Sequence, residues 1–296
     1  MIQDKGFGNR LFDIIVTLLL ALLGIACLLP LLNVLALSFS SKQAAVSGKV
    51  SFFPVDFTLD TYAYLLKEQR FFDAFFVSVR RVLLGGAINL VLTLLMAYPL
   101  SLESRVFPSR NRYMWFVVFT MLFAGGTVPW YFTINAVGIM DTIWALVLPG
   151  AVPVFNVILV MNYFRNLPRG IRESAEIDGV NALQMLIKIY IPISMPVIAT
   201  VTLFSVVNHW NSFFDGMLLI NTPEKIPLQT YIQALTIKAP SAMQSGNLTA
   251  AQVAERMAQR TFNAGKIVVS TIPILIIYPL LQRYFVSGIT LGSVKE

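Results

Sequence analysis

Six long apolar stretches are the feature that most constrains how this chain can fold. A helix that crosses the hydrocarbon core of a bilayer needs about 20 mainly apolar residues, and each stretch is close to that length. The sequence therefore predicts an all-α polytopic membrane protein. Its six transmembrane helices are expected at residues 11–39, 82–102, 113–134, 142–164, 188–207 and 267–285.

The composition supports this class. Charged residues make up 12% of the chain, against about 25% in a soluble domain, and 56% of the residues are hydrophobic. Such a chain is not disordered, does not bind nucleic acid and does not resemble most soluble enzymes. Cys27 is the only cysteine, so no intramolecular disulfide can form, and His209 is the only histidine, so a Cys/His metal cluster is excluded.

Lysines and arginines set the expected orientation. With the N-terminus inside, basic residues are about twice as dense in the inner segments as in the outer ones, in agreement with the positive-inside rule. Six spans then place both termini in the cytoplasm, although Arg80 and Arg81 at the outer end of the second span run against the trend. The first span is about twice as long as the apolar part of a signal peptide, which favours a retained anchor.

No acidic or basic side chain is expected deep within a span. Pumps driven by protons or sodium ions usually carry such groups, so the energy source is expected outside this chain. Prolines in the spans either pack the bundle or kink helices along a pathway that opens and closes. The polar groups in the middle of the spans either bond across helices or face a polar substrate; they are Asn89, Asn156, Asn162, Thr200 and Thr202.

The segment between the fourth and fifth spans carries the most informative pattern. Arg169–Asp178 is expected to form a short helix with Ala175 and Ile177 toward the same side. Gly179 can adopt positive φ and end this helix, and a second short helix over 182–189 then leads into the membrane. Two short amphipathic helices joined by a glycine form either a docking knob or an ordinary interfacial loop.

The spacing in this segment resembles the EAA loop of ABC importer permeases. That motif reads Glu-Ala-Ala, three residues, Gly, nine residues, Ile, one residue and Leu-Pro, and the chain departs from it at Ser174 and Ile191. The resemblance implies that this loop couples the chain to an ATPase. The coupling residues that it implies are Glu173, Ser174, Ala175, Glu176, Asp178, Gly179, Ile189 and Pro192.

Four further segments are similar to carbohydrate permeases of the branch related to the maltose-system inner subunit, and more closely to LplC-like oligosaccharide and polysaccharide permeases. These segments are 123–129, 141–146, 209–211 and 292–295. The resemblance implies a type I ABC importer permease fold. It also implies an oligosaccharide or polysaccharide fragment, uronate-containing fragments included, as the substrate. The composition alone does not indicate a sugar.

The same resemblance implies the assembly. This chain would be one of two homologous permease subunits in a bacterial cytoplasmic (inner) membrane, with two cytoplasmic ATPases and an extracytoplasmic solute-binding protein. The chain has no G-x-x-x-x-G-K-[ST] loop, so ATP and magnesium would be bound by the ATPases, and the chain itself would be no enzyme and hold no cofactor. Its parts would be an anchor with the first extracytoplasmic segment (1–72), a permease domain (73–285) with the coupling loop at 165–188, and a cytoplasmic tail (286–296).

Particular residues are assigned roles by the resemblance. Glu173 is expected to pair with a basic side chain of the ATPase. The tail either reaches into the ATPase interface or is a frayed terminus, and the residues concerned are Gly292, Ser293, Val294 and Lys295.

On the outer side, residues 248–266 have helical periodicity and either cap the bundle or bind the solute-binding protein. Trp210 either anchors the chain at the membrane interface or stacks on sugar rings. The candidate cavity residues are Asn156, Asn162, His209, Trp210 and Asn211.

The identity, length and charge of the sugar stay open. A group of outer basic residues suits an acidic glycan and equally suits lipid headgroups; it comprises Lys42, Lys49, Lys67, Arg70, Arg80 and Arg81. The alternative function is a stand-alone channel or secondary transporter for a small polar solute. An integral membrane enzyme would need a catalytic constellation, and the sequence shows none.

Overall fold

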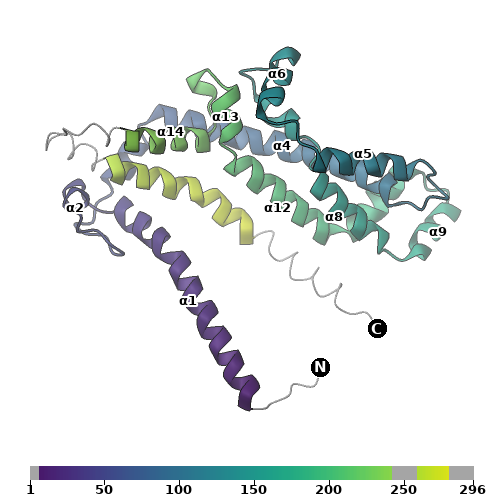
Figure 1. The fold of residues 1–296 in the computed structure, drawn as a ribbon, viewed down its shortest axis with the longest axis horizontal. Helices are drawn as coiled ribbons and strands as arrows, with labels where there is room; N and C mark the ends of the chain where they lie inside the picture. Colours follow the sequence, from purple (N-terminus) through teal and green to yellow (C-terminus); the bar gives the residue numbers. More distant parts are fainter. Residues whose placement is uncertain (1–6, 242–258, 280–296) are drawn as a thin grey trace. The chain divides into compact units, whose positions relative to one another are not determined.

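The computed structural model describes residues 7–241 and 259–279, and every regular element in these ranges is a helix (Figure 1). The chain divides into two compact units. One contains the residues up to 69 together with 234–271, and the other contains 70–233 together with the residues from 272 onward.

The first unit contains α1 (Phe7–Ser38), α2 (Lys42–Val46) and α3 (Asp60–Leu65). The most apolar stretch of α1 is not buried by any other part of the described chain. A helix with this surface is compatible with lipid rather than water. The last described helix, 259–279, begins in this unit, where its buried Lys266 pairs with Glu68 at 2.8 Å.

The second unit holds the remaining elements, and in it α8 packs against α5 and α12 (Figure 1). These elements are α4 (Gln69–Ser101), α5 (Arg110–Leu122), α6 (Thr127–Val137), α7 (Ile143–Val147), η1 (Leu148–Gly150), α8 (Val154–Arg165), α9 (Arg169–Ile177), α10 (Ala182–Gln184), η2 (Met185–Tyr190), α11 (Ile191–Ile193), α12 (Met195–Asn211), α13 (Phe214–Leu219), η3 (Pro223–Lys225) and the start of α14 (Leu228–Ser241).

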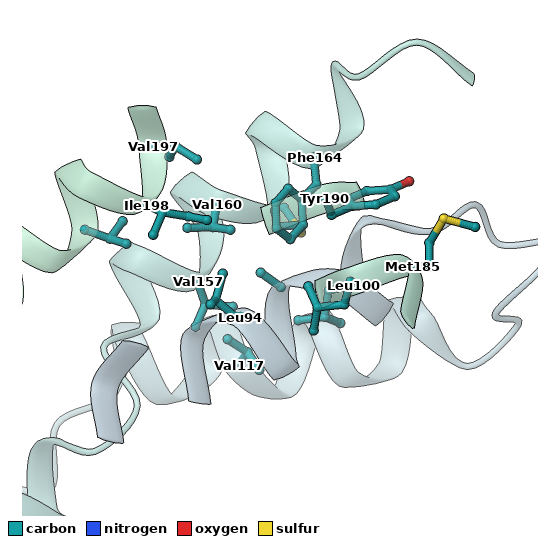
Figure 2. Close-up of a cluster of buried hydrophobic side chains, with 14 of the residues drawn as sticks. Leu94, Leu100, Val117, Val157, Val160, Phe164, Met185, Tyr190, Val197 and Ile198 are labelled. Carbon is teal, nitrogen blue, oxygen red and sulfur yellow. The ribbon is translucent and has the colours of Figure 1, made fainter. Parts of the chain in front are cut away.

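The core of this unit collects side chains from α4, α5, α8, η2 and α12 (Figure 2). Tyr190 lies between Phe164 and Tyr98, in edge-to-face contacts with ring centroids 5.1 and 5.2 Å apart. Lipid tails are as apolar as these side chains, so close packing stabilises this core more than removal from water does. The core fixes η2, and with it the segment that follows α9.

The six expected spans correspond to three continuous helices and three bent pairs. The continuous helices are 10–38, 69–101 and 259–279. The bends measure 114° between α5 and α6, 45° between η1 and α8, and 89° between α11 and α12. Each pair is long and apolar enough to count as one span, which gives up to six spans in the described part of the chain.

Glycine and proline account for the breaks. Between α5 and α6, Gly126 has a φ of +87°, a conformation that L-residues avoid. Pro153 directly precedes α8, and Pro192 and Pro196 flank Ser194 at the bend before α12. Proline has no backbone N–H to donate and therefore interrupts the helical hydrogen-bond ladder.

Several expected boundaries were wrong. The second span begins at Gln69 rather than Val82, so Arg81 lies inside a helix and not at its end. The fifth span extends to Asn211. The helix expected over 248–266 and the span expected from 267 are, in their described part, one continuous helix from 259 to 279.

Candidate functional site

The glycine-linked loop between α8 and α12 forms a compact knob, here defined as residues 169–184. Gly179 ends α9 with a φ of +75°, and the N–H of Val180 then donates to the carbonyl of Ala175 at 3.0 Å. Asn181 starts α10 with a reciprocal capping box, in which its side chain and that of Gln184 each accept a backbone N–H. The expected pair of short helices is therefore present.

The knob is attached to the core and presents polar groups outward. Ala175 is buried against the core of the unit, whereas Glu173, Glu176 and Asp178 are exposed. Ile177 was expected on the same side as Ala175, and this was wrong, because the side chain of Ile177 is 86% exposed. Leu183 on α10 is 58% exposed as well, so the knob carries two exposed apolar side chains beside its exposed acids.

Two ion pairs organise this surface. Arg172 pairs with Glu176 one turn away at 2.7 Å, and this hydrogen bond raises the pKa of Arg172 above its usual value. Arg169 pairs with Glu103 at 3.1 Å. No ion pair within the described ranges engages Glu173. Glu173 is therefore the acid on α9 that is available to a basic group outside the chain.

Beyond the knob, the remaining motif residues lie where the chain re-enters the bundle. Ile189 is half-buried against the core, and Pro192 is exposed in the first turn of α11, just before the 89° bend. Tyr190 lies between them, and its two aromatic contacts hold this turn against α4 and α8. The turn that joins the knob to α12 is therefore held in place by packed aromatic side chains.

A buried polar seam joins α4 to the end of α12, and the sequence reading missed it. Arg81 is 2% exposed; its guanidinium forms a bidentate ion pair with Asp215 and also donates to the carbonyl of Ser212 at 3.3 Å. The Ser212 hydroxyl donates to Asp215 at 2.9 Å. Arg81 was expected at the outer end of the second span, and the structure instead places it inside α4 as a buried, paired charge.

The seam continues one and two turns along α4. A Cβ atom at Gly85 would lie 2.4 Å from Nε2 of His209, so a larger residue there would displace the imidazole. Asn89 donates through Nδ2 to the carbonyl of Gly150 at 2.7 Å and accepts through Oδ1 from His209 Nε2 at 2.5 Å. Arg81, Gly85 and Asn89 recur at every fourth residue, which is the signal that could have revealed this face.

The residues proposed as cavity residues are not grouped in one place. Asn156 is buried and donates to the Val201 carbonyl and the Ser205 hydroxyl, both at 3.3 Å. Asn162 is exposed on α8. Thr200 and Thr202 donate to carbonyls of their own helix at 2.8 and 2.7 Å.

The three residues at the end of α12 point in different directions. His209 and Trp210 are buried, and Trp210 packs against Phe75 with ring centroids 5.7 Å apart, so it is no interfacial anchor. Asn211 is exposed and lines an open groove of about 710 Å³. The groove is lined by Leu203, Phe204, Val207, Asn208, Asn211, Ser212, Phe213, Phe214, Ile274 and Tyr278.

Asp141 fastens two loops together. Its backbone has a φ of +57°, and its carboxylate accepts from the N–H groups of Asn221 and Thr222 at 3.0 and 2.9 Å, from the Thr222 hydroxyl and from Lys225 at 3.0 Å. These bonds, that of the Thr222 hydroxyl foremost, hold the pKa of Asp141 well below its usual value. The carboxylate therefore stabilises the fold in its charged form.

We expect Asp141→Asn to lower the free energy of unfolding by roughly 1–2 kcal/mol at neutral pH, the size of hydrogen bonds to a half-exposed charge. Asparagine keeps the tolerance for positive φ, so the charge is what changes. Because folding lowers the pKa of Asp141, its carboxylate stabilises the fold at pH values above the unfolded carboxyl pKa of about 3.9. This stabilisation is lost as the pH falls through the pKa of the folded state. Thermal unfolding in detergent from pH 7 to pH 2 measures it. If wild type and Asp141→Asn lost stability by equal amounts as the pH falls, the stabilising role of the Asp141 charge would be contradicted.

The expected tail residues Gly292, Ser293, Val294 and Lys295 lie outside the described residues, as does most of the segment 248–266.

Comparison with known proteins agrees with this architecture. The chain is 38% identical to the polygalacturonan/rhamnogalacturonan transport system permease protein YtcP of Bacillus subtilis (strain 168), over 97% of this chain and 99% of that protein. It is also 38% identical to protein LplC of the same organism, over 97% and 96% of the two chains. A chain of a bacterial ABC transporter involved in the import of the acidic polysaccharide alginate superposes with a TM-score of 0.83 at 30% identity, over 95% of this chain and 99% of that one.

Residues 74–290 match the family described as the inner membrane component of binding-protein-dependent transport systems. This range begins within α4 and includes the knob, the seam and the groove. The expected type I ABC permease fold is confirmed, and this chain belongs to the family of binding-protein-dependent transport system inner membrane components.

Proposed function

We propose that this chain is a permease subunit of an ATP-driven importer for an oligosaccharide or polysaccharide fragment, uronate-containing fragments included, which a solute-binding protein delivers. The observation that carries the proposal is its similarity, over nearly its whole length, to a polygalacturonan/rhamnogalacturonan permease. Likeness to an alginate importer chain supports an acidic glycan as the substrate class. The sugar and its length are to be identified by transport measurements.

In this proposal the knob docks on a cytoplasmic ATPase. The exposed acids of α9 and the exposed Ile177 support this role, since a partner would cover them. The other members of the assembly would be a second homologous permease, a second ATPase and the extracytoplasmic binding protein. ATP and magnesium would be held by the ATPases, so this chain would carry no cofactor and no catalytic residue.

The proposed topology follows from the knob. With 165–188 in the cytoplasm, both termini would be cytoplasmic, and the tail over 286–296 would lie on the same side as the ATPases. Residues 1–72 would then form the anchor and the first extracytoplasmic segment, and 73–285 the permease domain. Cysteine labelling from either side of the membrane, at position 103 and at position 224, tests this topology.

Reconstitution tests the function as a whole. The assembly of both permeases, the ATPases and the binding protein is placed in liposomes and supplied with oligogalacturonides or with neutral oligosaccharides of equal length. We expect ATP-dependent uptake that requires the binding protein. Solute movement by this chain alone, without an ATPase, would instead support a stand-alone channel or secondary transporter.

We expect Gly179→Val to weaken ATPase association while the chain still inserts in the membrane. The position has a φ of +75° and open space around it, so the cost is conformational, about 1–2 kcal/mol for an L-residue in the left-handed region. The turn would shift and misplace α10 relative to α9. Co-purification of the ATPase with the detergent-solubilised permeases measures the effect.

Gly179→Asn is the matched control, because asparagine tolerates positive φ better than valine does. We expect ATPase association near the wild-type level for this variant. Normal ATPase association with the valine variant would contradict the role of this turn in docking.

A further inference from the structure

The segment that follows α2 turns back along the end of α1. Gly48, just after α2, has a φ of +68°, a left-handed conformation that reverses the chain. Three residues later, the carbonyl of Ser51 accepts a hydrogen bond from Nδ2 of Asn33 on α1 at 2.5 Å (Figure 1). Residues 49–57 are here called the return loop. Its Ser51 therefore lies beside the last turns of α1 and not beyond the end of that helix.

The other end of the return loop is fixed to α1 as well. The Ser40 hydroxyl accepts from the N–H of Val55 at 3.0 Å and donates to the carbonyl of Ala36 at 2.7 Å. The ring of Phe57 stacks on the ring of Phe39, with centroids 5.5 Å apart. Because the loop is bonded to α1 at two levels, its position along the helix is set by the fold.

The length of α1 gives the depth of the return loop in a bilayer. The apolar span Arg10–Ser38 has 29 residues. At 1.5 Å per residue it is about 43 Å long, close to the ~40–45 Å of the hydrocarbon and headgroup layers together. Asn33 precedes the end of the span by five residues, or about 7–8 Å, which is close to the thickness of one headgroup layer. Asn33 and the Ser51 carbonyl are therefore expected where the headgroups meet the hydrocarbon.

Two phenylalanines of the return loop are exposed at this level. The side chains of Phe52 and Phe53, directly after Ser51, are 46% and 82% exposed within the described part of the chain. Leu29, one turn before Asn33, is exposed as well, so the apolar surface of the loop continues that of α1. Exposed apolar patches mark contact with a protein or a membrane, and interfacial segments bury such side chains about 5–10 Å into the headgroup boundary.

The charged residues of the return loop suit a headgroup layer. Asp56 lies at the outer end of the loop, where its carbonyl accepts from the N–H of Ser41 at 3.1 Å, three residues past the end of α1. Lys49 is exposed, and its long stem allows the ammonium group to reach lipid phosphates while the loop stays beside α1. The loop is thus apolar at its inner end and acidic at its outer end, which is the order of polarity of a membrane surface.

We propose that the return loop is a lipid-contact surface, which inserts into the headgroup layer beside α1 with Phe52 and Phe53 against the acyl chains, and that Asn33 holds it at this depth. The most apolar stretch of α1 is not buried by any described part of the chain. A wedge at the end of α1 would therefore resist sliding of this helix along the membrane normal. The inference needs the chain in a membrane and does not depend on which solute is transported.

Spin labelling tests the depth of the loop. The importer is placed in lipid nanodiscs without the binding protein, with Cys27→Ala and cysteine-free partner subunits, and Phe53→Cys carries the nitroxide. Collisions with oxygen, which concentrates among acyl chains, are compared with collisions with a water-soluble nickel complex. We expect about tenfold fewer nickel collisions, and more oxygen collisions, than at Gln43→Cys, the matched exposed position on α2. Labelled Cys27 in the unchanged chain, exposed on α1, gives the hydrocarbon reference.

Three results would overturn the inference. Nickel collisions as frequent at position 53 as at position 43 would place the loop in water. Few collisions with either reagent would show that a protein such as the second permease covers it. Protection from nickel that appears only after the binding protein is added would assign this surface to that protein.

The role of Asn33 is tested by Asn33→Leu, which removes the bond to Ser51 and leaves an apolar side chain that suits lipid. We expect nickel collisions at position 53 to rise about fivefold, the effect of one lost hydrogen bond. Collisions at position 43 should stay unchanged, which shows that the fold is kept. If collisions at position 53 were also unchanged, the role of Asn33 in setting the depth would be overturned.

Discussion

Arg81→Met is expected to destabilise the protein by about 3–5 kcal/mol, the usual cost of removing one partner from a buried ion pair. Methionine has nearly the length of the arginine stem, so the change removes the charge and leaves little space. Asp215 would keep its bonds from Ser212 and Gly216, but its negative charge would lie in the seam without a cation. Thermal unfolding in detergent, together with the yield of folded protein, measures the effect.

Two controls distinguish the effect of breaking the ion pair from the effect of replacing any arginine on this helix. Arg80→Met changes the neighbouring exposed arginine and is expected to alter the unfolding free energy by less than about 0.5 kcal/mol. The double variant Arg81→Met, Asp215→Leu removes both charges and is expected to recover most of the loss. If the double variant were as unstable as the single one, the seam would depend on side-chain shape rather than on paired charge.

The class of the protein could be predicted from sequence because it follows from the length of apolar stretches. Six stretches near 20 residues allow few other folds, and the EAA-like spacing located the knob before any geometry was known. The conformation of Gly179 was predictable in the same way. Its positive φ was expected from its place between two short helices, and in the structure φ is +75°.

The bends could not be predicted in the same way. A proline indicates where a helix is weakened, but the angle depends on which side chains pack on either side of the break. The 114° bend between α5 and α6 and the 89° bend before α12 are results of that packing. Boundaries were missed for a related reason: Gln69–Arg81 has six polar residues among its thirteen, yet some of these side chains, Arg81 among them, are paired within the fold.

The seam and the groove were missed because both depend on partners far apart in the sequence. Arg81 and Asp215 are 134 residues apart, and neither is unusual when considered alone. Arg81 was expected at a helix end because the second span was expected to begin only at Val82. Trp210 and Asn211 were grouped by adjacency, whereas consecutive residues on a helix point about 100° apart, so one is buried and the other lines the groove.

Glu173→Lys is expected to abolish most sugar uptake while the chain still inserts and folds. Glu173 is exposed on α9, and within the described ranges it forms no ion pair, so its charge has no evident structural role in this chain. In the proposed assembly it meets a basic group of the ATPase, and reversing its charge would convert attraction into repulsion. Close charge pairs at interfaces are worth about 1.5–7 kcal/mol, so uptake should fall at least about tenfold.

The measurement is uptake and ATP hydrolysis by the reconstituted importer with loaded binding protein. Both should fall together, while the basal activity of the isolated ATPase stays unchanged because its catalytic groups are its own. Glu224→Lys reverses an equally exposed acid on η3, away from the knob, and should transport normally. A second check pairs Glu173→Lys with charge reversal of the facing basic residue of the ATPase, which should restore uptake. Uptake at the wild-type rate in Glu173→Lys alone, with unchanged ATP consumption per sugar, would show that coupling does not pass through this carboxylate.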